Sequence, residues 1–124
     1  MSLNRATLAE INLDAFRYNL RTIKSLVGRS TETMAIIKAD AYGHGATQCA
    51  RAAIDEGTKY LGVGIIQEGI ELRESGITSP ILILGGVYPD ELTELINYNL
   101  STSLSNSVIA SAISKKAEQA NKSV

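Results

Sequence analysis

The sequence predicts an α/β fold built from parallel strand–helix units, and three observations lead to this prediction. Short β-branched runs alternate along the chain with longer segments whose apolar residues recur every three or four positions. Glycines at 28, 57 and 76 end three of the helical segments. The runs 35–37 and 81–84 are continuously apolar, as expected for strands covered by helices on both faces. Right-handed crossovers between such strands give a parallel sheet.

The first part of the chain predicts a strand over 8–12 and then a helix that ends at Gly28. Asn12 or Asp14 is available as the N-terminal cap of this helix. A strand over 33–37 follows, and the next helix stops at Gly57. The inward-facing residues of the two helices are Leu13, Phe16, Leu20, Ile23 and Val27 in the first, and Ala46, Ala50, Ala53 and Ile54 in the second.

The second part of the chain repeats the unit three times. A strand over 60–65 leads to a helix over 67–75, and a strand over 81–84 leads to a helix that opens with Pro89-Asp90-Glu91. Proline suits the first turn, and acids suit the positive end of the helix dipole. A strand over 101–104 and a final helix complete the pattern; the apolar residues of that helix are Ile109, Ala112, Ile113, Ala117 and Ala120.

Two architectures fit these units: an open doubly wound sheet, or part of a β/α barrel. A barrel needs eight units and ~250 residues, so a chain of 124 residues supplies about half of one. The sequence ends on a polar helical stretch, 115–124, with no strand after it. We therefore expect a piece of a longer protein.

Composition narrows the function classes. A net charge of −1 and 44% hydrophobic residues indicate a globular chain. Basic residues are scattered and matched by acids, so no nucleic-acid partner is expected. No apolar run approaches the ~20 residues needed to cross a membrane, so no membrane partner is expected. The single cysteine, Cys49, fits a reducing cytoplasm, and no metal site is predicted.

Lys38 is the candidate functional residue, because it directly follows the apolar run that ends at Ile37. In α/β folds the chemistry lies at the carboxyl ends of the strands. A lone lysine at this place is more often one that leaves the sheet for water. Here Gly43 and Gly45 allow close approach of a ligand, and Gly45-Ala46 opens a helix whose free amides favour an anion. An amine beside a phosphate site suggests a Schiff-base cofactor, pyridoxal phosphate.

The run Ile37-Lys38-Ala39-Asp40-Ala41-Tyr42-Gly43-His44-Gly45 resembles the cofactor-attachment signature of the alanine racemase family. Related barrel decarboxylases share the strand-end lysine but usually lack the tyrosine-glycine-histidine-glycine run. Segments 10–20, 68–77 and 80–86 resemble further parts of the same family, in register. The resemblance therefore covers nearly the whole chain.

For the fold, the resemblance implies the first half of a TIM-type (β/α)8 barrel. Residues 1–124 would be the N-terminal portion of the barrel domain, with the other half of the barrel and a C-terminal β domain outside this chain. The strand near 8–12 would lie apart from the barrel strands, because in the family it joins that β domain.

For function, the resemblance implies pyridoxal-phosphate-dependent interconversion of L- and D-alanine, which supplies D-alanine for peptidoglycan, by a cytoplasmic homodimer. Lys38 would carry the cofactor and serve as one of two bases, and Tyr42 would hydrogen-bond the cofactor phosphate. The second base, a tyrosine of the partner subunit, has no counterpart here. Neither does the arginine that pairs with the pyridine nitrogen. We therefore expect this chain alone to be inactive.

Two alternatives stay open at this point: a non-catalytic pyridoxal-phosphate-binding domain, and a racemase for serine or a broader set of amino acids. Nearby residues have simpler expected roles. Asp40 would orient the loop or cap a turn, His44 would bond to local backbone at a helix start, and Cys49 would be a packed, inert thiol. Arg73 is expected to be a subunit or surface residue.

Overall fold

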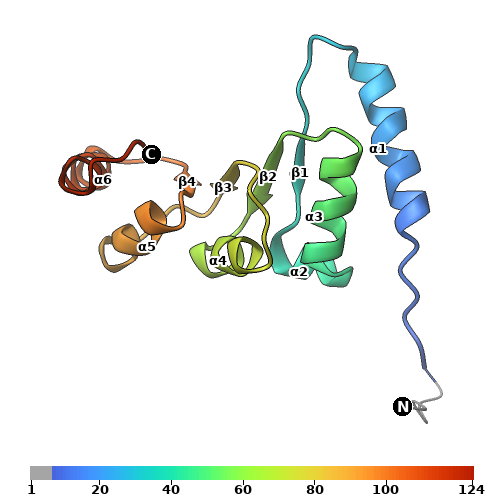
Figure 1. Ribbon diagram of the computed structural model, residues 1–124, viewed down its shortest axis with the longest axis horizontal. Helices are drawn as coiled ribbons and strands as arrows, with labels where there is room; N and C mark the ends of the chain where they lie inside the picture. Colours follow the sequence, from blue (N-terminus) through green and yellow to red (C-terminus); the bar gives the residue numbers. More distant parts are fainter. Residues whose placement is uncertain (1–6) are drawn as a thin grey trace.

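Four parallel strands form one sheet in the order β1-β2-β3-β4, which is the order of the sequence (Figure 1). In this computed structural model, which describes residues 7–124, the strands are β1 (Met34–Ile36), β2 (Tyr60–Val63), β3 (Ile81–Ile83) and β4 (Ser101–Thr102). Ala35 pairs with Leu61, Leu61 pairs with Ile81, and Leu82 pairs with Ser101. The predicted strands at 33–37, 60–65, 81–84 and 101–104 are confirmed, each with shorter limits.

Helices connect the strands. They are α1 (Leu13–Val27), α2 (Lys38–Gly43), α3 (Ala46–Asp55), α4 (Ile66–Glu74), the 3₁₀ turn η1 (Pro89–Glu91), α5 (Leu92–Asn97) and α6 (Ser107–Ala120). Asn12 caps α1, because its side-chain oxygen accepts the Ala15 N–H at 2.9 Å. Asn106 caps α6 in the same way through the N–H of Ile109. Within residues 7–124, no helix is long and apolar enough to cross a membrane.

Only one face of the sheet is covered by the described helices. Ala35, Leu61 and Ile81 point to that face and are at most 7% exposed, whereas Met34 and Ile36 on the other face of β1 are each 38% exposed. The expectation of helices on both faces is therefore wrong. These strands are continuously apolar because both of their faces carry apolar residues, although helices cover only one. Sequential strand order with helices on one side is the arrangement of a β/α barrel and not of a doubly wound sheet.

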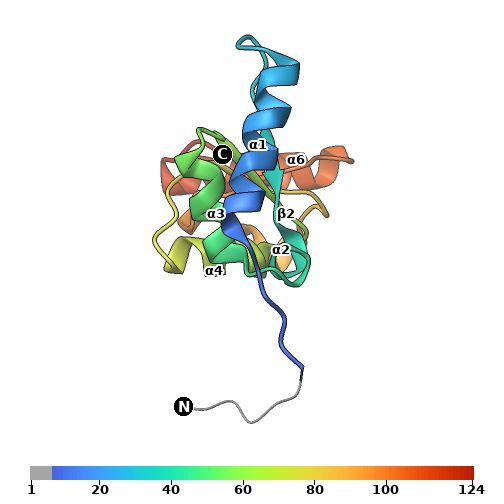
Figure 2. The ribbon, with the colours of Figure 1, turned by 90° about the vertical axis from the view of Figure 1, so that its right-hand side faces the viewer.

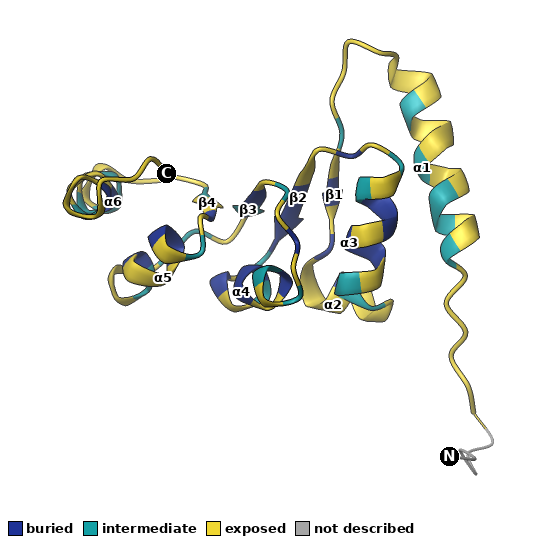
Figure 3. Cartoon of the chain, in the orientation of Figure 1, coloured by how far each residue is buried: buried dark blue, intermediate teal, exposed yellow. Residues whose placement is uncertain are grey.

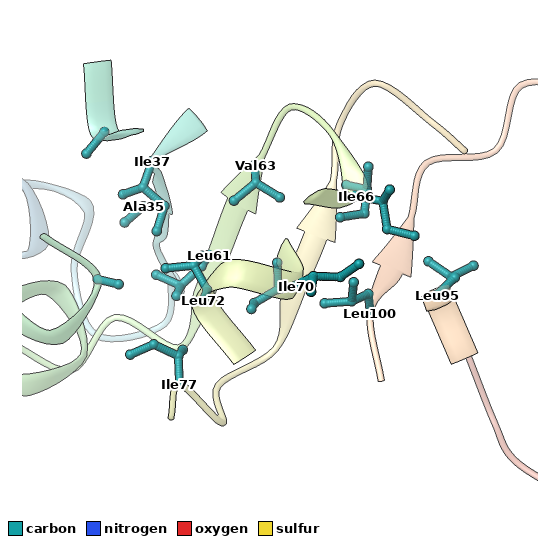
Figure 4. Packing of buried hydrophobic residues seen from close by; sticks show 14 of the residues in the cluster. Ala35, Ile37, Leu61, Val63, Ile66, Ile70, Leu72, Ile77, Leu95 and Leu100 are labelled. Atoms are coloured by element: carbon teal, nitrogen blue, oxygen red, sulfur yellow. The ribbon is translucent and has the colours of Figure 1, made fainter. Parts of the chain in front are cut away.

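The core lies between the sheet and helices α3, α4 and α5 (Figure 3). In Figure 4, Leu72 of α4 lies close to Leu61 of β2. The largest fully buried side chains are Ile37, Leu61, Val63, Leu72, Ile81, Ile83, Leu95 and Leu100. This packing holds the strand ends in place, including the end of β1 that carries Lys38.

The segment before α1 does not form the strand expected at 8–12. Residues 7–12 are exposed and have no strand pairing. They run away from the sheet, as Figures 1 and 2 show. The predicted strand over 8–12 is therefore wrong for this chain, because residues 8–12 lie beside no described strand with which they could pair. The expected separation from the other strands is found.

Helix α1 lies beside α3 (Figure 2), and its half-buried Leu13, Phe16 and Leu20 pack against the core. None of its residues is buried. Arg17 donates to the Asp55 carboxylate at 3.1 Å and to the Ala52 carbonyl at 3.2 Å, and Lys24 donates to the Glu56 carbonyl at 2.8 Å. These polar contacts hold α1 against the C-terminal end of α3.

Candidate functional site

Lys38 lies at the carboxyl end of β1, as the sequence predicts. The preceding residue, Ile37, is 1% exposed and donates its N–H to the Gly62 carbonyl at 2.8 Å, which continues the pairing with β2. Lys38 itself is exposed. Its stem lies beside Gly64, where an added Cβ would be 3.6 Å from the Lys38 Cβ and 3.9 Å from its Cδ. Within residues 7–124 the amine has no hydrogen-bond partner.

The residues after Lys38 form a left-handed helical turn that the sequence analysis missed. Ala39, Asp40, Ala41 and Tyr42 have φ between 50° and 57° and ψ between 35° and 52°. A left-handed conformation costs about 1–2 kcal/mol for each residue other than glycine. Four such residues in succession are stable only if the surrounding structure holds them.

Local hydrogen bonds hold part of this turn. The Ala41 N–H donates to the Ile37 carbonyl at 2.9 Å, and the Gly45 N–H donates to the Asp40 carbonyl at 2.9 Å. The Asp40 side chain accepts the N–H of Ala46, the first residue of α3, at 2.7 Å. The expected capping role of Asp40 is confirmed. The Ala46 N–H is therefore already bonded to Asp40. It is not free to bind an anionic ligand, as the sequence analysis expected for the amides at Gly45-Ala46.

His44 and Cys49 have the local roles expected for them. His44 Nδ1 lies 2.9 Å from the Ala41 carbonyl oxygen, to which it donates, and the His44 backbone N–H donates to the same oxygen. Cys49 is 3% exposed, with its Sγ 3.7 Å from the His44 carbonyl oxygen. Burial, and then the charge of Asp40, raise the pKa of the Cys49 thiol. The thiol is therefore protonated and packed.

Glu68 is a site residue that the sequence analysis did not single out. Its Oε1 accepts the Ala39 N–H at 2.7 Å, and its Oε2 accepts the N–H groups of Gly64 at 2.7 Å and Ile65 at 3.4 Å. The signal in the sequence is a glutamate at the third position of α4, which commonly reaches back to the amide before the helix. The bond to Ala39, 29 residues away, could not be read from that pattern.

Tyr42 extends away from the core and is 60% exposed. It lines a cavity of about 420 Å³ between α1 and β1, together with Ile36, His44 and Cys49, while Lys38 is not part of this lining. The Tyr42 hydroxyl, like the Lys38 amine, bonds to no other residue in the described range 7–124. An unpaired amine can react with an aldehyde, and an unpaired phenol can donate to a phosphate oxygen. These are the two kinds of group that a cofactor with an aldehyde and a phosphate requires, although the two side chains do not line the same cavity.

The chain matches the family described as alanine racemase, N-terminal domain, over residues 11–124. It is 45% identical over 120 residues to an alanine racemase from Carboxydothermus hydrogenoformans, covering 97% of this chain and 32% of the relative. Among solved structures, an alanine racemase from Clostridium difficile 630 superposes with a TM-score of 0.91 at 38% identity, over 97% of this chain and 31% of that one. An alanine racemase from Bacillus anthracis with bound L-Ala-P superposes with a TM-score of 0.82 at 28% identity, over 95% and 30% of the two chains.

The chain thus spans about a third of the length of the relatives it matches. The similarity extends through all four strand–helix units, and it confirms the first half of a TIM-type (β/α)8 barrel as the fold. The chain belongs to the alanine racemase family, within the N-terminal domain of that family.

Proposed function

We propose that this chain is the N-terminal portion of the barrel domain of a pyridoxal-phosphate-dependent alanine racemase, and that Lys38 carries the cofactor. The observation that supports this most directly is the position of Lys38. It is an exposed, unpaired amine among residues 7–124, at the carboxyl end of a barrel strand, where such folds carry out chemistry.

The roles of the two residues follow from their chemistry. The Lys38 amine would hold the cofactor through its aldehyde, and once released from that carbon and neutral it would take a proton from the α-carbon of the substrate or return one to it. The Tyr42 hydroxyl donates a hydrogen bond to a phosphate oxygen. Pyridoxal phosphate, when bound, supplies an electron-accepting ring that makes the α-proton of an amino acid acidic enough to remove.

Alanine is the proposed substrate, and the whole protein is proposed to interconvert its two enantiomers. The relatives are named alanine racemases, and the Bacillus anthracis structure contains L-Ala-P. The product D-alanine would feed peptidoglycan synthesis in the cytoplasm. The second half of the barrel, a β domain and a partner subunit would complete the enzyme as a homodimer.

This chain alone is not expected to racemise alanine. Loss of one positioned acid–base group typically costs ~10²- to 10⁴-fold in rate. The second base, a tyrosine of the partner subunit, is absent from these residues, and so is the arginine at the pyridine nitrogen. Loss of the closed, preorganised cavity adds to this cost.

The test is borohydride trapping on this chain, followed by peptide mapping, beside an assay for D-alanine. The Lys38 nitrogen bonds to the aldehyde carbon and the oxygen leaves as water. Borohydride then delivers hydride to the carbon of the C=N bond, and the nitrogen takes a proton from water. We expect the label mainly on Lys38 and no D-alanine.

Two variants control this experiment. Lys38→Arg keeps the charge but removes the reactive amine, and should abolish the main labelled peptide. Lys59→Arg removes another exposed lysine, one paired with Glu32, and should leave the Lys38 label unchanged. Label spread evenly over the lysines would remove Lys38 from its proposed role. Brisk racemisation by this chain would show that it needs no second half.

A further inference from the structure

We propose that Glu68 is a positioning residue for Lys38: it fixes the backbone on both sides of the lysine stem without touching the amine. This inference rests on the proposed function of Lys38 as the cofactor-bearing residue. Glu68 is half-buried and belongs to α4, whereas Lys38 follows β1. The carboxylate therefore joins two successive strand–helix units at their carboxyl ends.

Each carboxylate oxygen of Glu68 holds a different part of the site. Oε1 accepts the N–H of Ala39, the residue directly after Lys38 and the first of the left-handed turn. Oε2 accepts the N–H of Gly64, the residue against which the Lys38 stem lies. One side chain thus sets both the backbone that leaves the lysine and the surface that supports it.

The left-handed turn explains why such a bond is needed. The turn's other hydrogen bonds, from Ala41, His44, Gly45 and Ala46, join residues within 37–46. Among the described residues, the bond from Ala39 to Glu68 ties the turn to the next unit of the barrel. A bond from a backbone N–H to a carboxylate is stronger than a neutral one. It can therefore offset part of the cost of the left-handed backbone.

Glycine at 64 and 85 shapes the same place. A Cβ on Gly85 would lie 2.5 Å from the Gly64 carbonyl oxygen, and the Gly85 N–H donates to that oxygen at 3.0 Å. Gly64 is therefore held by Glu68 through its N–H and by Gly85 through its carbonyl. The lysine stem lies on a fixed backbone surface.

The test compares Glu68→Gln with Glu71→Gln in this chain. The side-chain amide in Glu68→Gln has one acceptor oxygen, so either Ala39 or Gly64 loses its partner while the shape is kept. Glu71 lies one turn further along α4, and its carboxylate accepts only from the Gln67 side chain, at 3.4 Å, among the described side chains. The readout is the share of borohydride-trapped pyridoxal phosphate on Lys38 relative to the other lysines.

We expect Glu68→Gln to lower the Lys38 share by about 5-fold or more, because small misplacements of a reacting group cost large factors. Glu71→Gln should leave it unchanged. Amide hydrogen exchange at residues 39 and 64, measured by NMR, should quicken in Glu68→Gln alone. Arg73→Gln, which adds no lysine, is a remote destabilising control, and it should keep the Lys38 preference.

The outcomes separate the inference from the function on which it rests. If the wild-type chain labels Lys38 selectively and Glu68→Gln does so equally, the positioning role is overturned and the proposed function stands. If the wild-type chain labels its lysines evenly, the proposed function fails and the positioning role fails with it. Should Glu68→Gln not fold, Glu68→Asp keeps the charge but is too short to reach both amides, and the same comparison applies.

Discussion

At the scale of single residues, several long polar side chains bind backbone carbonyls or amides that lie far from them in the sequence. Arg73 is the clearest case. Its guanidinium donates to the carbonyls of Ile77, Ser79, Tyr98 and Asn99 at 2.7–2.9 Å. Burial lowers the pKa of this guanidinium below its usual value. Within the chain Arg73 has a structural role, because it ties the end of α4 to the loops before β3 and β4. A further role at a subunit contact stays a prediction.

Arg73→Lys should lower the free energy of unfolding by about 2–4 kcal/mol. An ammonium group has three donors at one point and cannot reach four carbonyls spread around a planar guanidinium. Carbonyls left without a partner in a half-buried place carry most of the cost. Urea denaturation measures the change. Arg51→Lys is the matched control, because Arg51 donates to a single carbonyl, that of Ser75, and should change stability by less than about 0.5 kcal/mol. Equal losses in the two variants would contradict this account.

At the scale of elements, the helices could be predicted from the sequence and the turn α2 could not. Apolar spacing and terminal residues are local signals, so the limits of α1 and α3 follow from Asn12 and the glycines that end the helices. In α2 no residue between Lys38 and Gly43 demands a positive φ, and alanine disfavours it. Local bonds hold part of the turn, and the bond from Ala39 to Glu68 joins it to a distant residue that no local pattern contains.

The candidate site follows the same rule: features with local signals could be predicted, and contacts between units could not. The place of Lys38 at a strand end could be predicted because an apolar strand is a local signal, and its role stays a prediction. The local contacts of Asp40 and His44 could be predicted because their partners lie within six residues. Glu68 was missed as a site residue because its partner Ala39 belongs to another unit. The strand over 8–12 was predicted wrongly, because a sequence pattern does not show whether a neighbouring strand is available for pairing.

The left-handed turn predicts that the same substitution, alanine to glycine, changes the free energy of unfolding differently in α2 and in α1. Ala39→Gly removes the Cβ that disfavours a φ of 50° and keeps the N–H bonded to Glu68. It should be neutral or stabilising by up to about 1 kcal/mol, after the entropy gained by the unfolded chain is counted. Ala15→Gly, at an exposed position of the right-handed helix α1, should destabilise by about 0.5–1 kcal/mol. Urea denaturation of both variants measures these changes. Equal losses of unfolding free energy in the two variants would mean that the turn is not left-handed in solution.

At the scale of the whole molecule, the sheet is open in three ways. Within the described residues, β1 and β4 each pair with a single strand, so each presents an edge with unpaired backbone groups. The face away from the helices exposes Met34, Ile36 and Leu84, each at 38–39%. In a closed barrel these residues would point inward, and the edges would be paired. Water therefore reaches backbone and apolar groups that a complete barrel would cover.

We expect this chain to self-associate as its concentration rises, because a second copy can cover both an edge and the apolar face. Sedimentation velocity over a wide range of protein concentration measures this. Ile36→Lys places a charge on the uncovered face beside Gly62 and should shift the distribution toward the monomer. Leu26→Lys is the control, since Leu26 is 81% exposed on α1, away from the sheet face, and should leave association unchanged. A clean monomer at every concentration would contradict the prediction. Loss of association in Leu26→Lys alone would place the contact on α1 and not on the sheet.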